Sequence, residues 1–332
     1  MQTVSREEVA AEVEMVRRVT EARSRIMAEV ARRIVGQRET VEQLLVALFA
    51  GGHGLIIGVP GLAKTTLVST VAQCLDLAFS RVQFTPDLMP SDITGTEVLE
   101  EDRATGHRSF RFVRGPVFAN ILLADEVNRT PPKTQAALLE AMQEGRVTCA
   151  GRTYALDAPF VVFATQNPIE QEGTYPLPEA QLDRFMLALR MDYPDREDEV
   201  EVVRSTTGPR AESVSKVLSP ADVLEMQAIV RRVPTSDFVV RHAVNMVRRT
   251  RPPDDQAPQA VRDYVAWGAG PRAAQHLVLA AKALALLRGE FAVTKEHVDT
   301  LAVPVLAHRV VVNFHAEAER VTAVDLIRSL AT

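Results

Sequence analysis

The spacing of apolar residues is helical at both ends of the chain and changes in between. Over residues 5–33, charged residues alternate with valine, methionine, isoleucine and alanine, and we expect one or two amphipathic helices there. A further helix is expected over residues 40–50. Helical spacing returns over residues 197–204, 220–233, 273–288 and 295–307. We therefore predict an N-terminal helical segment, residues 1–33, and a separate all-helical domain, residues 194–332.

Between these helical parts, residues 34–193 carry short apolar runs separated by loops and helical stretches. Five runs are predicted as β-strands, over residues 54–57, 79–84, 120–124, 160–163 and 185–190. Continuous apolar runs of this length suit strands that are covered on both faces, as in a parallel sheet with crossover helices. The predicted fold class is therefore α/β, with a five-stranded, mostly parallel sheet followed by the all-helical domain.

The helix after the third predicted strand has the clearest boundaries. Thr130 is expected as its N-cap, Pro131 as its first residue and Gly145 as the residue that ends it. These three residues predict a helix that begins directly behind the third strand.

Two β-hairpins are predicted beside the sheet. Residues 97–99 and 108–113 flank a polar turn that contains Gly106, and Phe110 and Phe112 alternate along the second arm. Residues 146–149 and 153–156 flank a turn at Gly151. Both pairs are also compatible with ordinary surface hairpins.

Composition and charge exclude several classes of protein. The 332 residues are 46% hydrophobic and 24% charged, as in a globular protein of roughly two domains. The net charge of −5 and the lack of aromatic residues among the basic clusters argue against a nucleic-acid partner. The chain starts without an apolar signal region, and no apolar run approaches the ~18 residues of a membrane span, so a cytoplasmic protein is expected. Cys74 and Cys149 lack the spacing of a zinc site.

The strongest motif follows the first predicted strand and reads Gly-Val-Pro-Gly-Leu-Ala-Lys-Thr. A loop between a strand and a helix is the context that phosphate binding requires, because backbone N–H groups at a helix N-terminus form an anion cradle. Lys64 can reach the β- and γ-phosphates of ATP, and the Thr65 hydroxyl can coordinate Mg²⁺. Ala63 departs from the pattern, which has glycine before the lysine. The predicted ATP-binding loop comprises Gly58, Val59, Pro60, Gly61, Leu62, Ala63, Lys64, Thr65 and Thr66.

Two acidic residues, Asp125 and Glu126, end the third predicted strand. The carboxyl ends of parallel strands form the ligand edge of a sheet, so Asp125 is expected beside the phosphate loop. Asp125 would hold Mg²⁺ directly or through water, and Glu126 would polarise the attacking water. Asn167 ends the next strand and is expected to hold the water or the γ-phosphate. A pair of surface acids is the simpler alternative, and the upstream phosphate loop favours the catalytic interpretation.

Two arginines are candidates for contact with the transition state. Arg184 precedes the last predicted strand, too far round the sheet to serve its own nucleotide, and is expected to act across a subunit boundary. Arg272 opens a helix of the C-terminal domain and is expected to touch the γ-phosphate, of its own nucleotide or of a neighbour's, and to report its loss. Each arginine, taken singly, is also compatible with a surface salt bridge.

In this order the elements resemble the AAA+ superfamily, with Walker A, Walker B, sensor 1, arginine finger and sensor 2 residues in sequence. Four longer motifs look like the MoxR family, over residues 83–95, 125–129, 164–168 and 172–185. The resemblance implies an αβα core with a helical lid, in a hexameric, chaperone-like ATPase. It also implies a protein client, often a von Willebrand A domain partner, and a position near the adenine for Val35 and Gly36. The two hairpins would be the helix-2 insert and the pre-sensor-1 hairpin, facing the ring pore.

Three other functions are compatible with parts of the sequence. They are a small-molecule P-loop kinase, a nucleic-acid motor and a nucleotide-gated assembly module. The kinase leaves the hairpins and Arg184 unexplained. Asn128 and Arg129 lie beside the two acids without an assigned role, and His308 and His315 are expected on a solvated helix rather than at a metal site.

Overall fold

The structure is a computed structural model that describes residues 6–101, 107–169, 173–208 and 213–331. Its centre is a five-stranded sheet with the order β2-β5-β8-β1-β9, in which every neighbouring pair is parallel. The strands are β1 (Gly54–Gly58), β2 (Phe79–Gln83), β5 (Ile121–Asp125), β8 (Val161–Gln166) and β9 (Leu187–Met191). The predicted sheet is thus confirmed in strand number and direction.

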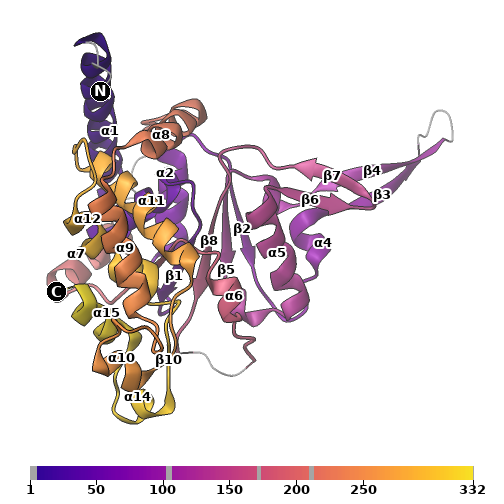
Figure 1. Ribbon diagram of the computed structural model, residues 1–332. Coiled ribbons are helices and arrows are strands. Elements are labelled where there is room, and N and C mark those ends of the chain that lie inside the picture. Colours follow the sequence, from indigo (N-terminus) through magenta and orange to yellow (C-terminus); the bar gives the residue numbers. More distant parts are fainter. Residues whose placement is uncertain (1–5, 102–106, 170–172, 209–212, 332) are drawn as a thin grey trace.

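Helices cover both faces of the sheet (Figure 1). One face packs against α2 (Arg38–Phe49) and α3 (Lys64–Cys74), and the other against α4 (Pro90–Thr94) and α5 (Pro132–Glu144). Neighbouring residues of one strand enter different cores, since Leu55 packs on the α5 side and Ile56 on the α2 side. This double coverage explains why the strands read as continuous apolar runs.

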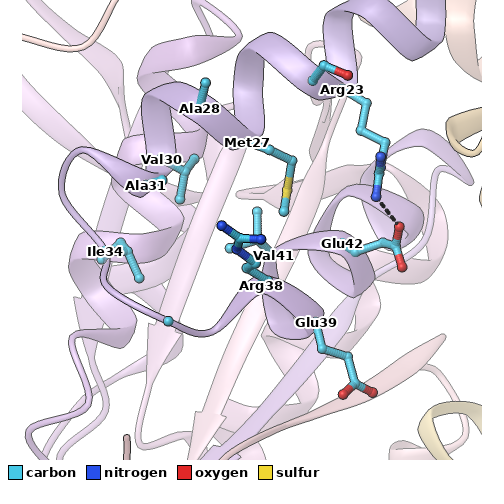
Figure 2. A pocket seen from close by; sticks show the side chains of 12 residues that line it. Arg23, Met27, Ala28, Val30, Ala31, Ile34, Arg38, Glu39, Val41 and Glu42 are labelled. Carbon is cyan, nitrogen blue, oxygen red and sulfur yellow. Dashed lines mark hydrogen bonds and ion pairs between the residues drawn. The ribbon is translucent and has the colours of Figure 1, made fainter. Parts of the chain in front are cut away.

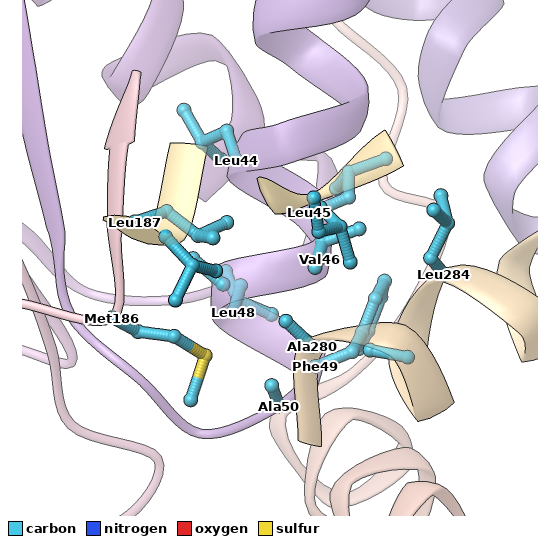
Figure 3. Packing of buried hydrophobic residues seen from close by; sticks show 14 of the residues in the cluster. Leu44, Leu45, Val46, Leu48, Phe49, Ala50, Met186, Leu187, Ala280 and Leu284 are labelled. Atoms are coloured by element: carbon cyan, nitrogen blue, oxygen red, sulfur yellow. The ribbon is translucent and has the colours of Figure 1, made fainter. Parts of the chain in front are cut away.

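Helix α2 lies at the centre of the larger core, between β9 and α11 (Pro271–Leu287) (Figure 3). Leu44, Leu45 and Leu48 are fully buried there, against Leu187 of β9 and Leu284 of α11. Burial of each leucine stabilises the fold by about 1.5–3 kcal/mol. The same core therefore joins the sheet to the C-terminal helices.

The C-terminal region is helical, as predicted, and forms the lid. Its helices are α7 (Arg196–Thr207), α8 (Pro220–Arg232), α9 (Asp237–Arg249), α10 (Gln259–Tyr264), α11, α12 (Lys295–Thr300), α13 (Ala302–Leu306), α14 (Phe314–Ala318) and α15 (Ala323–Ala331). Two short antiparallel strands, β10 (Val265–Trp267) and β11 (Val311–Val312), were not predicted. The helix expected over residues 295–307 is divided at Leu301, because Pro304 lacks the N–H that a continuous helix would need.

The N-terminal segment forms a single helix, α1 (Arg6–Ala31), that packs on α3 and α11. Val19, Ile26 and Val30 are buried on the face toward the core. Arg18 forms an ion pair with Asp222 of α8 at 2.6 Å. The helix therefore contacts both the sheet domain and the lid.

Thr130 does not cap α5, so that prediction is wrong. Its hydroxyl donates to the carbonyl oxygen of Thr85 at 2.6 Å, and the side chain is fully buried. The helix begins at Pro132, behind Pro131, because consecutive prolines fix the extended entry of the chain. Gly145 ends the helix in the left-handed conformation, with φ 60°, as predicted.

Both predicted hairpins are present and extend from the α5 side of the sheet (Figure 1). The longer one pairs β3 (Gly95–Glu101) with β4 (Arg108–Arg114), and the shorter one pairs β6 (Arg146–Cys149) with β7 (Arg152–Ala155). The predicted turn at Gly106 lies outside the described residues. The Phe112 ring stacks on Tyr154 of the shorter hairpin, with centroids 4.1 Å apart. Phe110 is 68% exposed.

Short helices complete the chain: η1 (Pro116–Phe118), η2 (Val127–Arg129) and α6 (Glu179–Leu182). Within the described residues, none of the helices has the length and apolar character required to cross a bilayer.

Candidate active site

The parallel register brings the predicted site residues to one edge of the sheet. Asp125 ends β5, level with Gln83 at the end of β2. Gln166 ends β8 and pairs with the next-to-last residue of β1, so Asn167 follows at the level of Gly58. Gly58 begins the phosphate loop. The loop, both acids and Asn167 therefore lie where parallel sheets bind ligands.

The phosphate loop connects β1 to α3, which begins at Lys64. The Lys64 ammonium donates to the carbonyl oxygen of Gly58, so its side chain crosses the loop. Ala63 has φ 55° and ψ 28°, the left-handed conformation that glycine adopts most readily. Alanine costs roughly 1–2 kcal/mol in this conformation. The phosphate loop thus keeps the backbone conformation expected of glycine, although alanine stands at this position.

Asp125 is held by two side chains from the neighbouring strands. The Thr165 hydroxyl on β8 donates to Oδ1 at 2.6 Å and accepts the Glu126 backbone N–H at 2.8 Å. The Arg81 guanidinium on β2 donates to Oδ2 at 2.6 and 2.9 Å. Thr165 is fully buried, so it fixes the position of the carboxylate relative to β8.

Glu126 has a backbone conformation that non-glycine residues seldom adopt, with φ 56° and ψ 51°. Its Oε2 accepts from Gln83 Nε2 at 2.7 Å and from Arg129 Nη1 at 3.0 Å. Strained backbone persists where the surrounding contacts determine it, and such positions cluster at functional sites. The carboxylate is therefore held at a defined position at the ligand edge.

Three contributors to this site were missed from the sequence: Arg81, Gln83 and Thr165. Arg81 and Gln83 alternate along β2 and so lie on the same face, which was the available signal. Thr165 was a hydroxyl within an apolar run. Two further residues beside the acids had no assigned role. Arg129 forms an ion pair with Glu126. Asn128 is buried, and its backbone carbonyl oxygen accepts the Tyr175 backbone N–H at 2.6 Å.

Asn167 is 5% exposed and follows the end of β8. Its Oδ1 accepts the backbone N–H of Ile169 at 3.2 Å. This bond fixes the amide at the ligand edge of the sheet, where its NH₂ group is available to a phosphate or a water.

The residues at this edge fit ATP and Mg²⁺. A Cβ placed at Gly61, whose φ is 88°, would meet no atom within 4 Å, so the loop is open where phosphates would lie. Thr65 and Asp125 supply the oxygen donors that Mg²⁺ prefers, and this ion typically takes one or two carboxylates with phosphates and water. Among the described residues, no three His, Cys, Asp or Glu side chains gather into a cluster suited to a metal.

A cavity of about 470 Å³ lies between α1 and the start of α2 (Figure 2). Met27 and Ile34 supply apolar lining (Figure 2). Gly36 is also among the residues that line the cavity. Gly36 has φ 66°, and a Cβ there would lie 2.4 Å from Oδ2 of Asp198 on α7. The first turn of α7 therefore packs directly against the segment that was expected near the adenine.

Arg184 and Arg272 lie at the amino ends of the strands, opposite the ends that carry the phosphate loop. Arg184 precedes β9, whose first residue, Leu187, pairs with the first residue of β1. Arg272, in the first turn of α11, forms an ion pair with Asp183 at 3.2 Å. The lid thus places Arg272 at the amino ends of the strands, whereas the phosphate loop follows the carboxyl end of β1. Arg184 lies at the same end of the strands, away from its own phosphate loop.

His308 is not on a solvated helix, so that prediction is wrong. Its Nε2 lies 3.0 Å from the carbonyl oxygen of Phe185, and burial together with the Arg309 charge holds its pKa well below the ordinary value. The adjacent Arg309 is buried and was missed from the sequence. An isolated arginine in an apolar helical pattern gave no signal of its role.

The buried histidines predict a loss of stability in mild acid. Burial lowers the pKa of His53 to about 4 and that of His276 to about 3, with a contribution from Arg309 and Arg272 to the latter. Between pH 6.5 and these values the unfolded chain binds protons that the folded chain excludes. Stability is therefore complete above pH 6.5 and falls below it, by on the order of 1 kcal/mol per pH unit for each histidine.

Urea unfolding at pH 7.5 and pH 5.5 measures this effect. We expect a smaller free energy of unfolding at pH 5.5, and a weaker pH dependence for His276→Gln, whose side chain does not titrate. An unfolding free energy that is equal at both pH values would contradict the lowered pKa values of the two buried histidines.

Comparisons with known proteins agree with this geometry. The family model for the ATPase family associated with various cellular activities (AAA) matches residues 53–187, and that for the AAA lid domain matches residues 257–330. The chain is 45% identical over 300 residues to Chaperone MoxR1 of Mycobacterium tuberculosis, covering 90% of this chain and 78% of that protein. It is 31% identical over 329 residues to Protein MoxR of Methylorubrum extorquens, covering 93% and 94%.

A crystal structure from Cytophaga hutchinsonii matches with a TM-score of 0.90 and 42% identity, over 97% of each chain. This match covers the sheet domain and the lid together. The chain belongs to the MoxR family of AAA+ ATPases.

Proposed function

We propose that this chain works as a hexameric ring that couples ATP hydrolysis to the remodelling or activation of a protein client. The position of Arg184 carries the proposal. It lies at the edge of the sheet opposite the phosphate loop of its own subunit. An active site that needs this arginine is completed only by a neighbouring subunit, as in other ATPases with an arginine supplied in trans.

Within one subunit, the loop Gly58–Thr66 and Lys64 would hold the phosphates, while Thr65 and Asp125 would hold Mg²⁺, partly through water. Bound Mg²⁺ neutralises charge on the phosphoryl oxygens. Glu126 orients the attacking water and accepts its proton, and Asn167 holds the water or the γ-phosphate. The cavity beside Gly36 supports a position for the adenine near Val35 and Gly36.

The lid would couple hydrolysis to movement. We assign residues 1–33 to an N-terminal helical segment, residues 34–193 to the AAA+ domain and residues 194–332 to the lid. The ion pair between Arg272 and Asp183 supports a role for Arg272 in trans, beside Arg184 and against the nucleotide of the neighbour. Hydrolysis in one subunit would then be sensed by the lid of the next.

The client and partner assignments rest on the family. A relative at 45% identity is named Chaperone MoxR1, which supports a chaperone-like role. A von Willebrand A domain protein is the proposed partner and the cytoplasm the proposed location. The protruding hairpin β3–β4 supports client contact at the ring pore, with the exposed Phe110 as its apolar anchor.

Phe110→Ala tests client contact directly. Buried anchor aromatics contribute about 2 kcal/mol or more to interfaces, so we expect the ratio of client-stimulated to basal ATPase to fall by about tenfold or more. Reduced, carboxymethylated α-lactalbumin serves as the unfolded probe, with its binding followed by fluorescence anisotropy. Phe314→Ala is the matched control, since Phe314 is an exposed aromatic of the lid. Equal binding and stimulation by the parent and the Phe110 variant would remove the hairpin from client recognition.

A further inference from the structure

Arg309 is a buried arginine that joins the lid to the segment that carries Arg184. It lies between α13 and β11, and its side chain is 2% exposed. Its Nε donates to Oδ1 of Asp183 at 2.8 Å, and its Nη2 donates to the Asp183 carbonyl oxygen at 3.0 Å. Nη2 also donates to the carbonyl oxygen of Phe185 at 2.7 Å. One guanidinium therefore holds the residues on both sides of Arg184.

The remaining contacts fix the guanidinium itself. Nη1 donates to the carbonyl oxygen of Met186 at 3.3 Å and to the carbonyl oxygen of Val305. His276 Nδ1 and His308 Nε2 each lie 2.7 Å from its nitrogens. Both rings have lowered pKa values, because burial and the nearby arginine charge favour their neutral forms. A buried charge with this many partners has one favourable position.

Arg184 takes its position from this anchored backbone. It is half-buried, and within the described part of the chain its side chain has no hydrogen bond or ion pair. Asp183, the residue before it, is shared by Arg309 and by Arg272, both from the lid. The sheet domain also holds the segment: the backbone N–H groups of residues 183–185 donate to carbonyl oxygens of α6, and the Met186 N–H donates to the His53 carbonyl oxygen at 2.7 Å. The lid is distinguished by the side-chain contacts of Arg309 on both sides of Arg184.

We propose that Arg309 is a positioning residue that transmits lid movement in one subunit to Arg184, and so sets the rate of hydrolysis in the neighbouring subunit. The inference rests on the proposed function, in which Arg184 acts in trans. A displacement of about 1 Å in a catalytic group lowers rates by up to about 100-fold, so small lid movements suffice. The planar fork of arginine is essential, because lysine has three donors on one nitrogen and cannot reach Asp183, Phe185 and Met186 together.

Mixed rings test this inference. Subunits with Glu126→Gln do not hydrolyse ATP themselves but still present Arg184 to their neighbours. Unmodified subunits are assembled with a large excess of such inactive subunits, so that most working sites receive the arginine of an inactive one. We compare inactive subunits that carry no further change, Arg184→Ala or Arg309→Lys. The turnover per working site is expected to fall by about tenfold or more with Arg309→Lys, toward the level seen with Arg184→Ala.

Arg288→Lys is the matched control. Arg288 also bridges the lid and the core, through Glu42 at 3.0 Å, but it lies away from Arg184. We expect inactive subunits with this change to behave like those with Glu126→Gln alone. Thermal unfolding and size-exclusion chromatography establish that every variant folds and enters rings, and Asp183→Asn replaces Arg309→Lys if the latter does not.

The outcomes separate the two proposals. The positioning role would be overturned if inactive subunits with Arg309→Lys, or with Asp183→Asn in its place, supported the same turnover as inactive subunits with Glu126→Gln alone. Turnover with Arg184→Ala equal to that with Glu126→Gln alone would overturn the shared active site itself, whatever Arg309 does.

Discussion

Glu126→Gln is expected to lower ATP turnover by about 10²–10⁴-fold, the range over which a general base contributes, while ATP remains bound. Glutamine is nearly isosteric with glutamate and still accepts from Gln83 and Arg129, which contact the carboxylate at 2.7 and 3.0 Å. It cannot take a proton from the attacking water. Phosphate release measures turnover, and a fluorescent ATP analogue measures binding.

Glu140→Gln is the control for this substitution, because Glu140 is an exposed residue of α5 on the same polypeptide segment. A turnover number for Glu126→Gln that matches that of the control would show that another group activates the water. Asp125 would then be the next carboxylate to test among the described residues at this edge of the sheet.

Arg184→Ala is expected to lower turnover by about 10³–10⁵-fold, the range for an arginine supplied to a phosphoryl-transfer site. The activity per subunit of the unmodified protein should rise with protein concentration as rings form, and the variant should stay low throughout. Analytical ultracentrifugation of both proteins separates loss of catalysis from loss of assembly.

Arg328→Ala, at an exposed position of α15, is the control for removal of a surface arginine. Activity per subunit that is constant with concentration, together with full activity of Arg184→Ala, would mean that each chain works alone. A monomeric P-loop kinase would then explain the site better than a ring.

The sheet and the ligand edge could be predicted from the sequence because their signals are local. Apolar runs gave the five strands, and the edge rule for parallel sheets placed Asp125 and Asn167 beside the phosphate loop. The residues that hold the acids were harder to find. Arg81, Gln83 and Thr165 act through contacts with neighbouring strands. No local sequence pattern predicts which strands are neighbours in the sheet.

The placement of the lid could not be predicted, and several errors follow from that. Helical spacing identifies a helix but does not say which edge of the sheet it packs against. The sequence therefore left open which subunit's nucleotide Arg272 faces, and its side chain lies beside Asp183. His308 appeared solvated, and Arg309 passed unnoticed, because their partners lie more than a hundred residues earlier in the chain. Thr130 was misassigned for a similar reason, since its partner Thr85 lies on another segment.

The stack of the Phe112 ring on Tyr154 joins the two hairpins, so that they act as one rigid unit. The chain leaves β4 and runs through η1 into β5, which ends at Asp125, and it leaves β7 and runs into β8, which leads to Asn167. Load on the protruding hairpin is therefore divided between the two neighbouring strands that carry the acids and the polar sensor. A pull on the hairpins would therefore enter both strands at their amino ends and reach the nucleotide edge along the length of the sheet.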